Sequence, residues 1–324
     1  MIHELQISIF LSIIFFSITY FGIKIIYKKF SSLVGECSYN EKSSLYHEKL
    51  LRGLGIIYPI SIIPILFFDN QLINFYDYLF LLSLVLLGFI DDKYSLNYKF
   101  KFIFFIIISF IYNYFLMLEM GSIVFTHLFI NIFFLVFFIV FFNQIDGING
   151  IAIFTFIISL FFISLLNGAS LTYLPIVSVF IPYLFINLKG KIGIQGDSGS
   201  YFLAGIFFIG LQQKFENFNH LISIIFICPI LIDLIVTTFV KVYCKDNIFE
   251  GHRDNLYQKL ATFKNSHLFS TLSFSSIQIF ICLISYYLFK NYNLNIFLLI
   301  MFFVLSIIFF VFLILSYKIN KHKL

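Results

Sequence analysis

The sequence predicts an all-α fold: a polytopic integral membrane bundle of about eleven transmembrane helices, forming a single domain over residues 1–324. Hydrophobic residues make up 60% of the chain and charged residues only 11%, where a soluble domain carries roughly 25%. Apolar runs of about 20 residues, the length that crosses a bilayer, recur along the chain. Basic residues gather between alternate runs, which is the asymmetry that orients membrane proteins.

Eleven apolar segments are expected to cross the membrane. In chain order they are residues 6–27, 54–68, 75–90, 100–118, 123–142, 150–166, 171–188, 200–213, 219–242, 267–289 and 294–317. The first run is long enough to span the membrane. No basic segment typical of a cleaved signal precedes it, so it is expected to stay in the mature protein. The segment 200–213 gives the weakest signal, since it is shorter than the usual span of about 20 residues.

The distribution of Lys and Arg orients the bundle with its N-terminus outside and its C-terminus in the cytoplasm. With eleven spans, 19 of the 21 basic residues fall on the cytoplasmic side, and only Lys214 and Lys290 fall outside. If residues 200–213 did not cross, eight basic residues would move to the outer side. The charge pattern therefore favours a crossing there.

The cytoplasmic loops also carry the unusual chemistry of the chain. Five of them are expected to build one active site, namely residues 28–53, 91–99, 143–149, 187–200 and 243–266. Their motifs are, in order, RGLG, DDKYSLNYK, NQIDGING, GDSGS and HRDNLYQKL. Helix caps that served only local structure would occur at both ends of a bundle, so the one-sided distribution favours a shared function.

Adjacent carboxylates form the first motif. Asp91 and Asp92 repel each other and lose solvation at the inner end of a span, and a bound cation relieves both effects. A solvated turn is the alternative, because the neighbouring Lys93 offsets one of the charges.

The segment DGING, residues 146–150, combines an acid with two glycines. Gly147 and Gly150 permit positive φ or a close approach of a ligand to the backbone. Asn149 fits a helix cap, whereas Asp146 lies too far upstream of the next helix for that role.

GDSGS, residues 196–200, places one acid in a small-residue turn that opens a helix. Exposed N–H groups at a helix start attract phosphate, and Asp197 beside them has the chemistry to hold a divalent cation that bridges the same phosphates. A helix cap by Ser198 or Ser200 is the alternative.

The last loop is basic. His252 fits a proton donor or phosphate contact, and Arg253 fits a bidentate phosphate clamp. Lys259 and Lys264 are better explained by contact with anionic lipid.

One acid lies inside a span. Asp233 is about 12 Å from Lys241, the residue that marks the inner end of the same helix. Intramembrane acids usually face the bundle interior, so Asp233 is expected to structure the floor of the site rather than to react.

Acids and bases on a single rim indicate a Mg²⁺ ion, with Mn²⁺ as an alternative, and a substrate that carries a diphosphate. Mg²⁺ prefers a few carboxylates, with water and substrate phosphate completing its octahedron.

The order of these motifs resembles the polyprenyl-phosphate N-acetylhexosamine-1-phosphate transferases, a superfamily (glycosyltransferase family 4) that includes the phospho-MurNAc-pentapeptide translocase. The similarity runs from RGLG at 52–55 to HRDNLYQ at 252–258. It implies transfer of a sugar 1-phosphate from a UDP-N-acetylamino sugar to undecaprenyl phosphate, with release of UMP. It also implies Mg²⁺, no nucleic-acid partner, and a homodimer as one assembly to consider.

The resemblance implies roles for individual residues. Asp197 matches the principal metal ligand, and Asp91 and Asp92 match an acidic pair that acts on the lipid phosphate or the metal. The predicted catalytic residues are Asp91, Asp92, Asp146 and His252; the predicted substrate-binding residues are Arg52, Asn143, Asn149, Asn187 and Arg253; the predicted metal ligands are Asp197 and Asp92.

Two differences from the translocase indicate which subgroup of the superfamily the chain resembles. Asn149 stands where the translocase has a second acid, and HRDNLYQ replaces its three-His run. The latter is similar to the subgroup that initiates O-antigen or capsule repeats, so the peptidoglycan translocase is the alternative. A secondary transporter is the alternative of another class, although transporters bind near the midplane between inverted repeats and the sequence has no such repeat.

Overall fold

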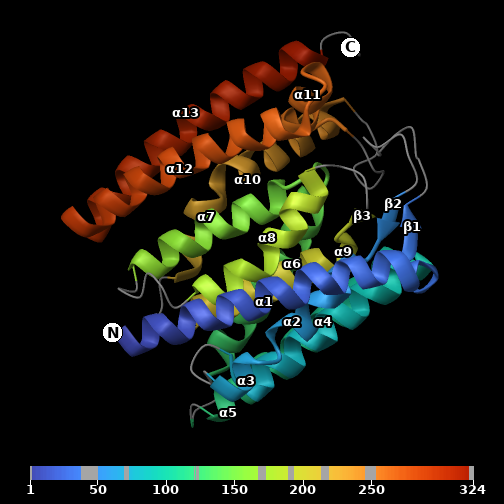
Figure 1. Ribbon diagram of the computed structural model, residues 1–324. Helices are drawn as coiled ribbons and strands as arrows, with labels where there is room; N and C mark the ends of the chain where they lie inside the picture. The colour runs from blue at the N-terminus through green and yellow to red at the C-terminus, as the bar shows by residue number, and fades with distance from the viewer. Residues whose placement is uncertain are drawn as a thin grey trace.

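A computed structural model of the protein describes residues 2–37, 50–68, 73–119, 121, 124–166, 173–188, 193–212, 219–244 and 253–320. The helices run side by side along the long direction of one bundle (Figure 1). They are α1 Ile2–Lys29, α2 Ile57–Ile62, α3 Ile65–Phe68, α4 Phe75–Tyr94, α5 Tyr98–Glu119, α6 Phe125–Ile145, α7 Ile151–Leu166, α8 Leu174–Leu188, α9 Gly196–Gln212, α10 Asn219–Tyr243, α11 Leu256–Phe263, α12 His267–Asn291 and α13 Leu294–Asn320.

Six helices in this part of the chain are long and apolar enough to cross a membrane. They are Gln6–Lys29, Tyr98–Glu119, Phe125–Ile145, Ile224–Tyr243, His267–Asn291 and Asn295–Ser316. The predicted class, a helical membrane protein, is therefore supported. The count of eleven spans and the orientation stay predictions, because the remaining apolar helices are shorter or carry more charge.

The segment with the weakest hydropathy signal, 200–213, lies in the centre of the bundle. Its helix, α9, begins earlier than predicted, at Gly196, and every residue from Gly196 to Leu211 is buried. A helix that is enclosed by other helices needs little lipid-facing length. Its short apolar run therefore reflects burial within protein.

The predicted span 54–68 is divided into α2 and α3. Pro64 lies at the break, between Ile62 and Ile65. Proline has no N–H to donate and its ring clashes with the preceding turn, so a continuous helix is disfavoured there.

Gly88 on α4 and Gly55 in the turn before α2 let the start of α9 approach closely. A Cβ on Gly88 would lie 2.5 Å from the backbone nitrogen of Ser198, and a Cβ on Gly55 would lie 2.2 Å from that of Gly199. A methyl group does not fit at either point. This contact sets the last turn of α4, with Asp91 and Asp92, against the first turn of α9.

A small three-stranded sheet was not predicted. Strand β2 (Leu50–Arg52) pairs antiparallel with β1 (Gly35–Cys37) and parallel with β3 (Gly193–Ile194), so that Arg52 lies opposite Gly35 and Ile194. The sheet lies at the same end of the bundle as α11 and the start of α9, opposite the end where the N-terminus lies (Figure 1). It ties the first long loop to the segment before α9.

Candidate active site

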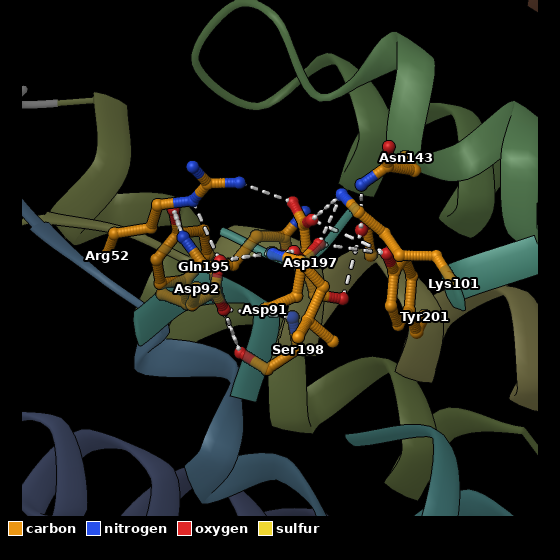
Figure 2. Close-up of polar contacts among 12 residues, drawn as sticks. Arg52, Asp91, Asp92, Lys101, Asn143, Gln195, Asp197, Ser198 and Tyr201 are labelled. Atoms are coloured by element: carbon orange, nitrogen blue, oxygen red, sulfur yellow. Dashed lines mark hydrogen bonds and ion pairs between the residues drawn. The ribbon is translucent and has the colours of Figure 1, made fainter. Parts of the chain in front are cut away.

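Three aspartates and two cations meet at the end of the bundle that carries the sheet. Asp91 and Asp92 come from the last turn of α4, Asp197 from the first turn of α9, Arg52 from β2 and Lys101 from the first turn of α5. We call these five residues the carboxylate cluster. Figure 2 shows Arg52 and Lys101 approaching the aspartates from opposite sides.

Asp92 holds the beginning of α9 in place. Its Oδ1 accepts hydrogen bonds from the N–H of Asp197 (2.8 Å) and from Nε of Arg52 (2.8 Å). Its Oδ2 accepts from the N–H and the Oγ of Ser198, at 3.1 and 2.9 Å. The first N–H groups of a helix have no partner within it, so Asp92 caps α9 from a neighbouring helix. Its four acceptor positions are thereby used.

Arg52 links Asp92 to Asp197. While its Nε contacts Asp92, its Nη2 donates to Oδ1 of Asp197 at 2.7 Å. The fork of the guanidinium spans two carboxylates at once, which an ammonium group does not do with fixed geometry. Gly53, with φ of 100°, follows Arg52 and places its backbone beside the Asp92 side chain.

Asp91 and Lys101 face each other across the turn between α4 and α5. Lys101 Nζ lies 2.5 Å from Asp91 Oδ2 and 3.6 Å from Asp197 Oδ2. The other oxygen of Asp91 accepts from the N–H of Leu96 at 2.8 Å. Tyr201 Oη lies 3.4 Å from both Asp91 Oδ2 and Asp197 Oδ2. Asp197 is therefore the point at which Arg52, Lys101 and Tyr201 converge.

The cations are more accessible than the acids. The side chains of Arg52 and Lys101 are 32% and 25% exposed, whereas those of Asp91, Asp92 and Asp197 are at most 9% exposed. An anionic substrate that enters from solvent meets positive charge first. Phosphates bind arginine and lysine favourably, so the rim of the cluster fits a phosphate.

The three carboxyl groups of the cluster lie beyond the predicted spans 75–90 and 200–213. Their surroundings shift their pKa values in different directions. Burial raises the pKa of Asp91 to about 6 and, together with the charge of Asp197, that of Asp92 to about 7. Burial opposes ionisation of Asp197 too, yet its interactions with Asp91, Arg52 and Lys101 lower its pKa to about 2. A proton in the cluster therefore belongs on the α4 pair, and Asp197 keeps its charge.

The segment that follows α6 lies beside the cluster. Asn143 Nδ2 donates to Ser200 Oγ at 3.4 Å, and Ser200 Oγ donates to the carbonyl of Asp197 at 3.2 Å. Asp146 ends α6 and is partly buried. Burial raises its pKa well above the usual value, and the charges of Asp197 and Asp92 act in the same direction. These contacts join the predicted NQIDG loop to the first turn of α9.

Buried hydrogen bonds connect α8 with the residue before the GDSGS turn. Tyr183 Oη accepts from Asn187 Nδ2 (2.9 Å) and from the N–H of Gln195 (2.5 Å). Gln195 Oε1 accepts from Tyr58 Oη at 3.3 Å. Asn187 is thus connected to the GDSGS turn through Tyr183, which the sequence had not singled out.

Asn149 and Arg253 are not among the contacts of the carboxylate cluster described above. The backbone of Asn149 contacts the start of α12: its N–H donates to His267 Nδ1 (3.2 Å) and its carbonyl accepts from Thr271 Oγ1 (2.8 Å). Arg253 is partly buried just ahead of α11. His252 lies outside the described residues. The predicted roles of these three residues remain predictions.

The donors at the cluster are hard oxygen atoms, which suit Mg²⁺. In the described part of the chain no three His, Cys, Asp or Glu side chains are arranged around one metal position. Mg²⁺ in phosphate sites commonly takes only one or two carboxylates and completes its shell with water and substrate. Asp197 fits this role, because its partners are movable side chains, whereas Asp92 is committed to the backbone of α9.

Lys101 and Tyr201 were missed as site residues. Helices α4 and α5 are joined by residues 95–97, with Ser95 in the left-handed region at φ of 51°. So short a connection makes the two helices an antiparallel pair and sets the first turn of α5 beside the last turn of α4. That geometry was a usable signal for Lys101. Tyr201 had no comparable signal, because its partners come from distant segments.

Residues 75–213, from the start of α4 to just beyond α9, match the family model described as glycosyl transferase family 4. No curated protein matches the chain. The match supports the predicted superfamily of polyprenyl-phosphate hexosamine-1-phosphate transferases and leaves the subgroup open.

Proposed function

Because residues 75–213 of the chain match the family model of glycosyl transferase family 4, we propose that the protein transfers an N-acetylamino-sugar 1-phosphate from a UDP-sugar to undecaprenyl phosphate. The products are undecaprenyl-diphosphate-sugar and UMP. The proposed place is the cytoplasmic face of a bacterial inner membrane, where the reaction would initiate O-antigen, capsule or another envelope glycan.

The observation that carries the proposal is the carboxylate cluster. Three buried acids and two more exposed cations lie at one end of an apolar bundle. A lipid phosphate remains in the membrane surface and a UDP-sugar remains in water, so the two meet only at such an end. In the reaction, a lipid phosphate oxygen attacks the sugar-side phosphorus, and the bond to the UMP oxygen breaks.

Approach of two phosphates is the electrostatic difficulty of this reaction. When bound, Mg²⁺ supplies charge neutralisation at the diphosphate, and Asp197 is the residue proposed to hold it. Arg52 and Lys101 line the accessible side of the cluster and attract both phosphates. Because the protein holds these charges before substrate arrives, little reorganisation accompanies the transfer.

Asp91 is the proposed proton acceptor for the lipid phosphate. Its pKa of about 6 resembles that of a phosphate monoester, which is about 6, so the proton is shared nearly evenly between them. The carboxylate form dominates at neutral pH. A residue with such a pKa accepts a proton at pH 7 and releases it without a large cost.

An apolar groove between α6 and α10 fits the lipid tail. It has a volume of about 320 Å³ and lies between α6, from Phe137 to Gln144, and α10, from Leu231 to Val242. Gln144 at its end is two residues from Asp146. A prenyl chain in this groove would lie along α6 and α10, and the rest of the chain would remain in the bilayer.

Filling this groove is expected to impair use of the lipid alone. Leu234→Trp is predicted to raise KM for undecaprenyl phosphate roughly tenfold, about 1.4 kcal/mol of binding, because the indole would occupy space that the prenyl chain needs. KM for the UDP-sugar should change less than about twofold. Leu299→Trp, on the exposed face of α13, is the matched control. Equal effects of the two substitutions would count against the groove.

A secondary transporter remains the rival class. Transporters place ligands near the membrane midplane, on interrupted helices. The cluster lies at the end of α4, the start of α9 and the start of α5, which fits an interfacial enzyme better.

The test is release of UMP by the purified protein in detergent, with undecaprenyl phosphate, Mg²⁺ and a panel of UDP-sugars. The panel contains UDP-GlcNAc, UDP-GalNAc, UDP-QuiNAc, UDP-FucNAc and UDP-MurNAc-pentapeptide. Release that depends on the lipid with one of the first four supports the proposal. Release only with the last would identify the peptidoglycan alternative, and no release with any would overturn the proposal.

A further inference from the structure

Asp233 caps a helix other than its own. Its side chain is completely buried in α10, and its two oxygens accept hydrogen bonds from the N–H groups of Leu256 (2.9 Å) and Tyr257 (3.1 Å). These are the first two residues of α11. The N–H groups in the first turn of a helix need an outside acceptor, and Asp233 supplies it from the neighbouring helix.

The residue that would ordinarily cap α11 does something else. Asn255 occupies the N-cap position, but its side chain makes no capping hydrogen bond. Its Nδ2 donates to Tyr257 Oη at 3.1 Å instead. Asparagine is among the strongest N-cap residues. Asp233 therefore caps α11 in place of Asn255, and its hydrogen bonds fix α11 to α10.

Helix α11 in turn touches the segment after α6. Tyr257 Oη donates to the carbonyl of Gln144 at 3.3 Å. A Cβ on Gly147 would lie 2.5 Å from Gln258 Nε2, so that side chain lies directly on the glycine. The two contacts bracket Asp146. The carbonyl of Tyr257 also accepts from Ser270 Oγ at 2.5 Å, which fastens α11 to α12.

We propose that Asp233 is a positioning residue for residues 144–147 of the active site, the segment around Asp146 that the family resemblance places beside the nucleotide. It sets the place of α11, and Tyr257 and Gln258 on α11 set the place of residues 144–147, which include Asp146. The inference deepens the proposed function and depends on it for its kinetic consequences. Asp233 itself does not touch substrate, since both of its oxygens are used by backbone donors in the bundle interior.

Asp233→Asn is the first test. The amide keeps one acceptor but turns an NH₂ group toward the other N–H, so one capping bond is lost. We expect KM for the UDP-sugar to rise about 10- to 100-fold, the usual effect of removing a supporting contact at a functional site. KM for undecaprenyl phosphate should stay within about twofold. Tyr257→Phe, which removes the contacts of the hydroxyl with Gln144 and Asn255 and leaves the Asp233 caps in place, should give a smaller change in the same direction.

Thr237→Val is the matched control. Thr237 lies one turn after Asp233, and its Oγ1 is 3.5 Å from Asp233 Oδ1. The substitution removes this long contact and leaves both backbone contacts intact. Its kinetic constants should equal those of the unchanged protein.

A measurement without substrate keeps the inference separate from the proposed function. Hydrogen exchange of the backbone amides is expected to speed up in Asp233→Asn at residues 144–147 and 256–263, and to stay unchanged at 196–200. This result would support the positioning role even if no UDP-sugar were turned over. Unchanged exchange at 144–147, or equal changes in KM for both substrates, would overturn it.

Discussion

Asp197→Asn is expected to reduce sugar-phosphate transfer roughly 10²–10³-fold, which corresponds to a loss of about 3–4 kcal/mol of transition-state stabilisation. The charge of Asp197 is maintained by its surroundings, which lower its pKa to about 2. Arg52, Lys101 and Tyr201 all converge on its carboxylate. An amide in this place carries no charge to hold a divalent cation. The initial rate of UMP release at saturating substrates measures the effect.

Asp77→Asn is the matched control for this experiment. Asp77 is also a buried aspartate in the first turn of a helix, with hydrogen bonds from Tyr112 Oη (2.6 Å) and the N–H of Asn74 (3.0 Å). It lies at the far end of α4 from Asp91 and Asp92. We expect it to change stability and to leave the rate within about threefold. A folded Asp197→Asn protein with an equally small loss of rate would remove Asp197 from the mechanism.

Asp92→Ala is expected to reduce stability as well as activity. It removes the acceptor of the N–H groups of Asp197 and Ser198, both buried, and each buried donor without a partner costs about 1–3 kcal/mol. A loss of roughly 2–6 kcal/mol in the free energy of unfolding follows. Thermal unfolding in detergent, compared with Asp91→Ala, measures it. Asp91 accepts only one backbone N–H, so its loss should be smaller.

This comparison separates two roles for the acidic pair. If Asp92 acts chiefly as a metal ligand, its removal should abolish transfer and leave the unfolding temperature near that of the unchanged protein. If it acts chiefly as the cap of α9, both should fall together. A protein with normal stability and no activity would therefore contradict the capping role that the hydrogen bonds indicate.

The sequence predicted residues that meet in the structure best where a motif lies next to a helix end. DD at 91–92 and GDSGS at 196–200 end and begin helices that pack on each other at Gly88. Their carboxylates therefore meet, as the shared hydrogen bonds of Asp92 with the start of α9 show. Asn149 illustrates the opposite case, since its contacts run to α12 and no local pattern indicates that direction.

The amino-acid sequence by itself predicted a helical membrane protein, most of its helices, and the acids that gather at one end; it did not predict α11, which lies in the predicted loop 243–266, or the division of 54–68 into α2 and α3. The predicted properties follow from hydropathy, charge and helix-breaking residues, which act over a few turns. Only the tertiary structure decided that Arg52 joins Asp92 to Asp197, that Lys101 completes the cluster, and that Asp233 caps α11. Such pairings join residues separated by many positions, and they depend on how closely helices pack. Packing distances are a property of the assembled bundle, and no short stretch of sequence contains them.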